Sequence, residues 1–198
     1  LADDLGYSEL GSYGQKKIKT PHLDHLATQG MRFTRNYCGN AVCAPSRCVF
    51  ITGKHPGHAF VRNNGEVKPE GQRPIPKAEQ TIAELLRSHG YGTGAFGKWG
   101  LGFPGSEGDP INQGFDTYKV GILETTDGTM YPESMRRTGM DEEAIVRTRP
   151  YIWESDGEGG LRKVRPYDLA YREQVEGDIA GAAVEFIDDH ASKKEPFF

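Results

Sequence analysis

The feature that most limits how this chain can fold is the alternation of amphipathic helical stretches with short apolar runs. Helical periodicity and end signals predict helices at 20–30, 80–89 and 173–190. Residues 31–37 alternate between apolar and polar side chains as a strand does, and 91–99 form a second strand-like run. Alternating helices and strands are typical of α/β proteins, so we predict an α/β fold with a largely parallel sheet.

Length and composition favour a single globular domain. The chain has 198 residues, of which 36% are hydrophobic and 26% charged, values that suit a packed core. No clean linker divides it, and residues 104–166, rich in Gly, Pro and charge, are expected to form long surface excursions over the sheet edge. Because the chain opens without Met and closes on a strand-like run at 195–198, we expect a fragment truncated at both ends.

Charge and hydropathy argue against two classes of partner. The formal net charge is −4 and basic residues are dispersed, whereas nucleic-acid binding needs a clustered basic face. No apolar run approaches the roughly 18 residues of a membrane-spanning helix. We therefore predict no nucleic-acid partner and no membrane span.

The chain has three cysteines, Cys38, Cys43 and Cys48, spaced by five residues. Their odd number argues against a disulfide framework, and their spacing does not fit a zinc ribbon.

Chemistry is concentrated around Cys43. Pro45 suits the first turn of a helix and Gly53 its end, so Cys43 is predicted at a helix N-terminus. Unpaired N–H groups and the helix dipole favour an oxyanion there, and Arg47, one turn on, can direct its guanidinium to the same place. A sulfate or phosphate ester is the ligand expected at this helix N-terminus. The alternative is a buried structural cysteine, with Arg47 in a surface ion pair.

The run Cys-x-Pro-Ser-Arg at 43–47, followed by Thr52-Gly53, resembles the signature of the sulfatase family. The resemblance implies an alkaline-phosphatase-like α/β fold with a mostly parallel central sheet flanked by helices, of which residues 1–198 would form the N-terminal catalytic part. Four further segments resemble the family and occur in its order: Ala2-Asp3-Asp4-Leu5-Gly6-Tyr7, Thr20-Pro21-His22-Leu23-Asp24, Gly97-Lys98-Trp99-Gly100-Leu101-Gly102 and Gly114-Phe115-Asp116.

The resemblance also implies the chemistry. In this family the cysteine at the position of Cys43 is oxidised to formylglycine by a formylglycine-generating enzyme, and the aldehyde is hydrated to a geminal diol. One hydroxyl attacks sulfur and displaces the alcohol, and the second expels sulfate, so one hard step is split into two. The implied substrate is a sulfated small molecule or saccharide. Most relatives are exported, which implies a periplasmic, extracellular or lysosomal location.

By the same resemblance Asp3, Asp4 and Cys43 bind a divalent metal, Ca²⁺ or alternatively Mg²⁺, while Arg47 and Lys98 act on the sulfate. Adjacent carboxylates are hard oxygen ligands of the kind that Ca²⁺ prefers. Without the resemblance, an Asp-Asp pair is also typical of a turn or a helix cap, and a lysine at a strand end can be solvated. Two aspartates are too few for a shell of roughly 6–8 oxygens. The resemblance implies that the further ligands and the general acid lie beyond residue 198.

One position departs from the family pattern. Gly100 stands where many relatives have a histidine that assists the nucleophile. His58 is a candidate to take over part of the role of the missing histidine at Gly100, and the alternative is that His58 is an ordinary surface histidine.

Residues 92–97 match G-x-G-x-x-G and, with Lys98, begin like a P-loop, but such loops follow a strand and open a helix. Here a helix precedes the glycines and Trp99 stands where a P-loop has Ser or Thr, so nucleotide binding is not predicted.

Two rival functions remain open from the sequence. A phosphate- or phosphonate-ester hydrolase of the same superfamily would use the same helix terminus, arginine and metal. A non-catalytic fragment with an unmodified Cys43 would carry a free thiol that alkylating reagents label.

Overall fold

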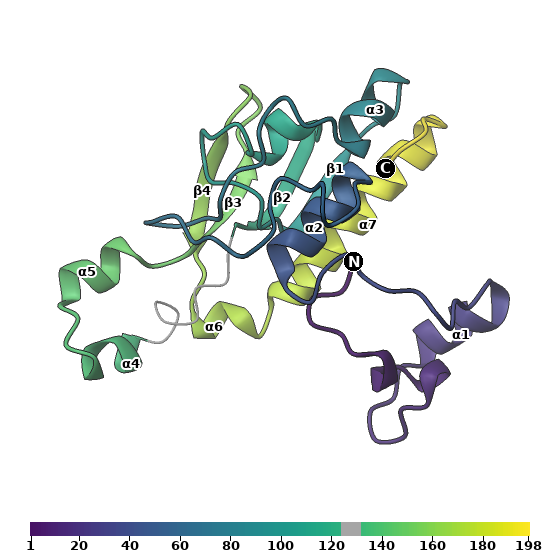
Figure 1. Ribbon diagram of the computed structural model, residues 1–198, viewed down its shortest axis with the longest axis horizontal. Helices are drawn as coiled ribbons and strands as arrows, with labels where there is room; N and C mark the ends of the chain where they lie inside the picture. Colours follow the sequence, from purple (N-terminus) through teal and green to yellow (C-terminus); the bar gives the residue numbers. More distant parts are fainter. Residues whose placement is uncertain (124–131) are drawn as a thin grey trace.

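The computed structural model describes residues 1–123 and 132–198 of the chain (Figure 1). At its centre lies a four-stranded sheet in the order β1-β2-β3-β4. The strands β1 and β2 pair in parallel, whereas β2 with β3 and β3 with β4 pair antiparallel. The predicted α/β class is confirmed, and the sheet in these residues is mixed. The strands are β1 (Gly94–Lys98), β2 (Thr117–Ile122), β3 (Tyr151–Ser155) and β4 (Leu161–Pro166).

Helices lie on both faces of this sheet, with α2 on one face and α7 on the other (Figure 1). None of the helices in residues 1–123 and 132–198 has both the length and the apolar character needed to cross a bilayer. The helices are α1 (Pro21–Gln29), α2 (Cys43–Thr52), α3 (Ile82–Ser88), α4 (Pro132–Arg137), α5 (Glu142–Arg147), α6 (Leu169–Arg172) and α7 (Val175–Lys193), with 3₁₀ turns η1 (Tyr7–Glu9), η2 (Gly11–Tyr13) and η3 (Pro110–Gln113).

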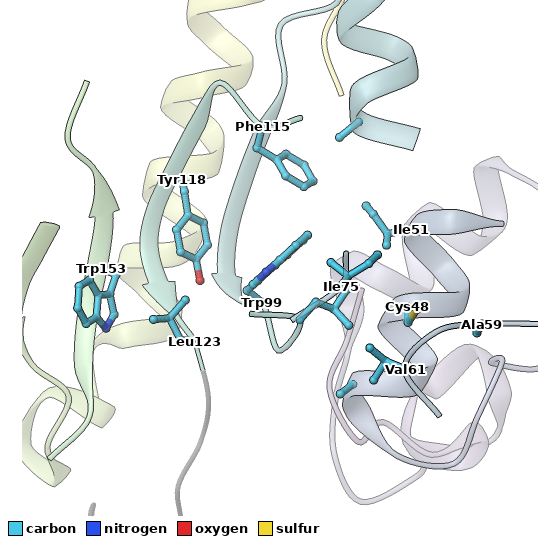
Figure 2. Close-up of a cluster of buried hydrophobic side chains, with 13 residues drawn as sticks. Cys48, Ile51, Ala59, Val61, Ile75, Trp99, Phe115, Tyr118, Leu123 and Trp153 are labelled. Atoms are coloured by element: carbon cyan, nitrogen blue, oxygen red, sulfur yellow. The ribbon is translucent and has the colours of Figure 1, made fainter. Parts of the chain in front are cut away.

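Two hydrophobic cores hold the layers together. The first core joins α2, through Ile51, to one face of the sheet, where Tyr118 of β2 is fully buried (Figure 2). The second core joins the opposite face, through Ile122 of β2, to Val175 at the start of α7. Burial of these side chains, each contributing about 1.5–3 kcal/mol, fixes α2 and α7 against the sheet.

The predicted helices are confirmed as α1, α3 and α7. Thr81 and Glu84 form the predicted capping box of α3, in which the Thr81 hydroxyl accepts the Glu84 N–H at 3.1 Å. The helix α2 ends as predicted at Gly53, whose φ of 65° is the left-handed conformation that glycine adopts without strain. Thr20 does not cap α1 through its side chain, because its hydroxyl accepts the N–H of Gly11 at 2.9 Å instead.

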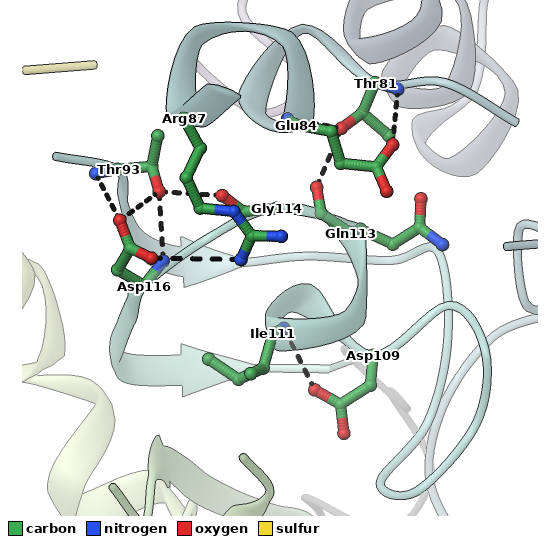
Figure 3. A network of polar contacts seen from close by, with 9 residues as sticks. All are labelled: Thr81, Glu84, Arg87, Thr93, Asp109, Ile111, Gln113, Gly114 and Asp116. Carbon is green, nitrogen blue, oxygen red and sulfur yellow. Dashed lines mark hydrogen bonds and ion pairs between the residues drawn. The ribbon is translucent and has the colours of Figure 1, made fainter. Parts of the chain in front are cut away.

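A buried polar network joins α3 to the loop before β2 (Figure 3). The Thr81 hydroxyl donates to the carbonyl of Gln113 at 2.7 Å, and the Thr93 hydroxyl donates to the carbonyl of Gly114, also at 2.7 Å. The carboxylate of Asp116 accepts the N–H of Thr93 at 3.1 Å. These bonds hold the residues that enter β1 and those that enter β2 side by side.

The predicted strand at 31–37 is wrong. This segment belongs to no strand, and it leaves Met31, Phe33 and Tyr37 exposed. A strand is stable only where a neighbour completes its backbone hydrogen bonds, and none of the described strands runs beside this segment. Alternation alone was therefore an insufficient signal.

The expectation that 104–166 forms surface excursions is wrong for much of that range. It contains β2, β3 and β4, and Tyr118 within it is buried. Much of its Gly and Pro lies in the loop 104–114 and in the turn 156–160, so the average composition concealed the strands between. The turn 156–160 is also too short for a crossover, which makes β3 and β4 antiparallel. Residues 124–131 of this range lie outside the described residues.

The last residues of the chain lie beside β1. Phe197 forms a parallel bridge with Gly92, and the N–H of Gly94 donates to the carbonyl of Phe198 at 2.9 Å. The strand-like run predicted at 195–198 thus forms an isolated bridge at Phe197 and no strand.

Candidate active site

The predicted nucleophile lies at the amino end of α2. Cys43 is the first residue of this helix, half-buried and without a disulfide partner. The N-cap residue Val42 has no acceptor in its side chain, and the N–H of Ala44 donates instead to Oδ1 of Asn64 at 3.1 Å. The N–H of Ser46 donates to the carbonyl of Val42 and Pro45 has no N–H, so it is mainly the helix dipole that makes the surroundings of Cys43 favourable to an anion. Sequence reasoning missed Asn64, because no local pattern links it to a helix 20 residues away.

Lys98 brings a positive charge to Cys43 from the end of β1. Its Nζ donates to Sγ of Cys43 at 3.2 Å and to Oδ2 of Asp3 at 2.7 Å. Because β1 ends at Lys98, the side chain leaves the sheet at its carboxyl edge, where α2 begins. The structure thus brings together the predicted nucleophile and the lysine predicted to contact sulfate.

Arg47 joins the same cluster from one turn along α2. Its Nη1 donates to the carbonyl of Lys98 at 2.6 Å, and its Nη2 donates to Oδ1 of Asp3 at 3.0 Å. The side chains of Arg47 and Lys98 are only 12% and 13% exposed. Arg47 does form an ion pair with Asp3, whose side chain is 36% exposed, as the alternative reading allows, but the burial of both cationic side chains also suits an anion site.

The charges of this cluster stabilise one another. Partial burial opposes ionisation of Asp3, but its bonds to Lys98 and Arg47 outweigh burial, so the pKa of Asp3 lies below its ordinary 3.8. Burial also disfavours the charged form of Lys98, but its bonds to Asp3 and Cys43 outweigh that effect and raise its pKa above the ordinary 10.5. Asp3 is therefore an anion, and Lys98 a cation, at neutral pH.

Asp3 and Asp4 lie close enough to Cys43 to share a metal ion with it. One ligand atom of each of the three residues lies within 4.8 Å of the other two. Carboxylate oxygens suit Ca²⁺ or Mg²⁺, so this donor set fits part of the shell of the predicted ion. The three residues predicted as metal ligands are thus brought together.

A cavity of about 900 Å³ opens beside the cluster. Its charged lining comes from Asp3, Asp4, Arg47, Lys98, Arg172 and Glu176, and most of its other lining residues are apolar. Cys43 is not among the described residues that line it. Its size lies within the range typical of small-molecule sites.

Gly100 lies directly against Arg47. Its φ is 75°, which favours glycine, and an added Cβ would lie 3.4 Å from Cδ of Arg47. His58, the candidate for the vacancy at Gly100, packs its ring against His55 at 6.2 Å between centroids. The described residues that line the cavity include neither His58 nor Cys43, so the role of His58 stays a prediction.

The glycine run 92–97 has no geometry for nucleotide binding. Gly94 and Gly97 lie within β1, and the helix α3 precedes them. The order is the reverse of a phosphate-binding loop, as the sequence indicated.

Comparison with known proteins decides the family. A model of the sulfatase family, described as "Sulfatase", matches residues 1–198. The chain belongs to the sulfatase family. Arylsulfatase D of Homo sapiens is 39% identical over 162 residues, which cover 77% of this chain and 26% of that protein. Arylsulfatase A of Homo sapiens is 44% identical over 120 residues, which cover 60% of this chain and 23% of that protein. The chain thus spans about a quarter of the length of these curated relatives.

A solved sulfatase has the same fold. The PsFucS1 sulfatase from Pseudoalteromonas sp. matches with a TM-score of 0.81 and 24% identity, over 100% of this chain and 41% of that protein. This likeness confirms the predicted alkaline-phosphatase-like α/β fold of the sulfatase family.

Proposed function

We propose that the complete protein hydrolyses sulfate esters, with position 43 as the source of the nucleophile. The observation that carries this proposal is the polar cluster at the amino end of α2. Lys98 contacts both Cys43 and Asp3, and Arg47 contacts Asp3 and the carbonyl of Lys98. Two buried cations and a helix terminus suit the negative oxygens of a sulfate group. Membership of the sulfatase family supports sulfate over other oxyanions.

The two cations have separate roles. Lys98 Nζ, 3.2 Å from Sγ of Cys43, places positive charge at the point where an ester oxygen would meet the nucleophile. Arg47 is fixed by two hydrogen bonds that use two of its five N–H donors, which leaves donors for sulfate oxygens. Asp3 accepts from both side chains and so keeps them in place before the substrate binds.

Cys43 is proposed to be converted to formylglycine by a formylglycine-generating enzyme. The hydrated aldehyde supplies a hydroxyl nucleophile for sulfur and a second hydroxyl that allows sulfate to leave. Beside it, the charge of Lys98 favours the ionised form of a hydroxyl group at position 43. Before conversion of Cys43, the bonds of Lys98 to Asp3 and Cys43 hold its pKa above the ordinary value and keep it charged.

Asp3, Asp4 and the side chain at position 43 are proposed to hold a Ca²⁺ or Mg²⁺ ion. Their ligand atoms lie within 4.8 Å of one another, and carboxylate oxygens suit either ion. The bound metal supplies positive charge that polarises sulfate oxygens. We further propose that the protein is exported and that its substrate is a sulfated small molecule or saccharide.

Paired turnover assays on an aryl sulfate and the matching aryl phosphate test the function. In the complete mature protein we expect sulfate hydrolysis to dominate and Cys43→Ala to abolish it. Cys38→Ala is the matched control, because Cys38 is an exposed cysteine outside the cluster, and should retain full activity. Dominant phosphate hydrolysis would favour the phosphate- or phosphonate-ester hydrolase, and full activity of Cys43→Ala would contradict the assignment of the nucleophile.

A further inference from the structure

The pairing of β1 with β2 changes register next to the site. Phe96 pairs with Lys119, whereas Lys98 pairs with Ile122, so β2 advances by one residue more than β1. Val120 lies within the extra step and has a φ of 48°, which is rare for a β-branched residue. A bulge of this kind, with a strained residue, typically redirects a side chain near a functional site.

The bulge reverses the faces of β2. In a regular strand Tyr118 and Val120 would lie on the same face. Tyr118 lies instead in the core shared with α2, whereas Val120 lies in the core shared with α7.

The same reversal occurs in β1. Phe96 packs against Phe186 of α7 at 5.5 Å between ring centroids, so regular alternation would turn Gly97 toward α2 and Lys98 toward α7. At Gly97, however, an added Cβ would point at α7 and lie 3.1 Å from Cδ1 of Ile179, and its φ is 78°. Lys98 then contacts the amino end of α2 and not the face of α7.

A buried tyrosine holds this irregular backbone. The hydroxyl of Tyr118 donates to the carbonyl of Gly97 at 2.9 Å, and its side chain is fully buried. Figure 2 shows the hydroxyl directed toward the carboxyl ends of the strands. Gly121 leaves room for the ring, because a Cβ there would overlap Cε1 of Tyr118.

We propose that Tyr118 is a positioning residue for Lys98. By holding the Gly97 carbonyl, its hydroxyl keeps the bulge in the conformation that directs the Lys98 ammonium to Cys43 and Asp3. The inference rests on the proposed function, since it assigns Tyr118 a role in sulfate hydrolysis through Lys98. Tyr118 touches neither Cys43 nor the sulfate site, so it acts only through the backbone.

A double-mutant cycle in the complete mature protein tests this role. Tyr118→Phe keeps the ring and removes the hydrogen bond, and we expect kcat/KM for an aryl sulfate to fall about tenfold, mainly in kcat. In a Lys98→Ala background the same change should alter kcat/KM by less than about twofold, because the residue it positions is gone. Rates are normalised to folded protein, measured by circular dichroism.

Tyr171→Phe is the matched control. Its hydroxyl donates to the side chain of Asp178 at 2.6 Å and not to the backbone next to Lys98. Loss of this hydroxyl should leave kcat/KM within about twofold in both backgrounds. An equal fall for Tyr118→Phe with and without Lys98, or no fall at all, would overturn the positioning role. Should Lys98→Ala alone leave sulfate hydrolysis unchanged, the proposed site itself would be wrong, whatever Tyr118 does.

Discussion

Asp3 is the residue on which the charges of the site depend. One carboxylate oxygen accepts from Arg47 and the other from Lys98, so a single anion orders two cations. The carboxylate of Asp4 lies in the same cluster, so two anions balance the two cations. In the proposed site, a bound divalent ion would add the positive charge that an arriving sulfate meets.

Among single residues of the site, Arg47 gives the clearest prediction. Arg47→Lys should lower kcat/KM for an aryl sulfate about 100-fold, because an ammonium cannot reach the Lys98 carbonyl and Asp3 with two arms while still contacting the substrate. Steady-state kinetics of the complete protein measure the effect.

The control for that experiment is Arg87→Lys. Arg87 forms a half-exposed ion pair with Asp116 at 3.8 Å, away from Cys43, and its replacement should leave kcat/KM within about twofold. Equal kinetics for the Arg47 and Arg87 variants would show that Arg47 has no part in the site.

Elements position the site through their ends. The helix α2 begins at Cys43, and β1 ends at Lys98, so the groups of the candidate site lie where a helix terminus meets the carboxyl edge of a sheet. The helix ends could be predicted from local signals such as Gly53. The bulge at Gly97 could not, because it arises from the pairing of β1 with β2 and leaves no mark in the local periodicity.

A substitution at Thr81 tests how much the cap of α3 contributes to the stability of the fold. Thr81→Ala removes both the cap of α3 and the hydroxyl that donates to the Gln113 carbonyl, and should lower the free energy of unfolding by about 2–3 kcal/mol. Urea denaturation of the complete protein measures it. Thr81→Ser retains the hydroxyl and should cost less than about 1 kcal/mol; a similar loss in both variants would show that the methyl group, not the hydrogen bonds, matters.

At the scale of the whole molecule, the sequence predicted which residues form the candidate site but not which contacts bring them together. Cys43 and Arg47 belong to one local motif, so they could be found without the fold. The contact between Lys98 and Asp3 spans 95 residues and that between Lys98 and Cys43 spans 55. Such contacts depend on which strands pair and in what register. The sequence alone predicted the α/β class but not that pairing.

The surface of the 198-residue chain leads to a further prediction. The segment around α1 extends away from the sheet, and it exposes large apolar side chains (Figure 1): Leu23, Leu26, Met31, Phe33 and Tyr37. Exposed apolar surface on this scale binds hydrophobic dyes and favours association. We expect the 198-residue chain, expressed alone, to bind anilinonaphthalene sulfonate and to raise its fluorescence. No rise in fluorescence would show that these side chains are covered in solution.

The most direct test of the central claim is mass spectrometry of the tryptic peptide 36–47 from active, alkylated protein. This peptide contains both Cys38 and Cys43, so the exposed Cys38 serves as an internal control. We predict one alkylated thiol, at Cys38, and an aldehyde without sulfur at position 43 that reacts with hydrazine reagents. Two alkylated thiols in a preparation that hydrolyses aryl sulfate at its full rate would contradict the claim that position 43 supplies the nucleophile as formylglycine.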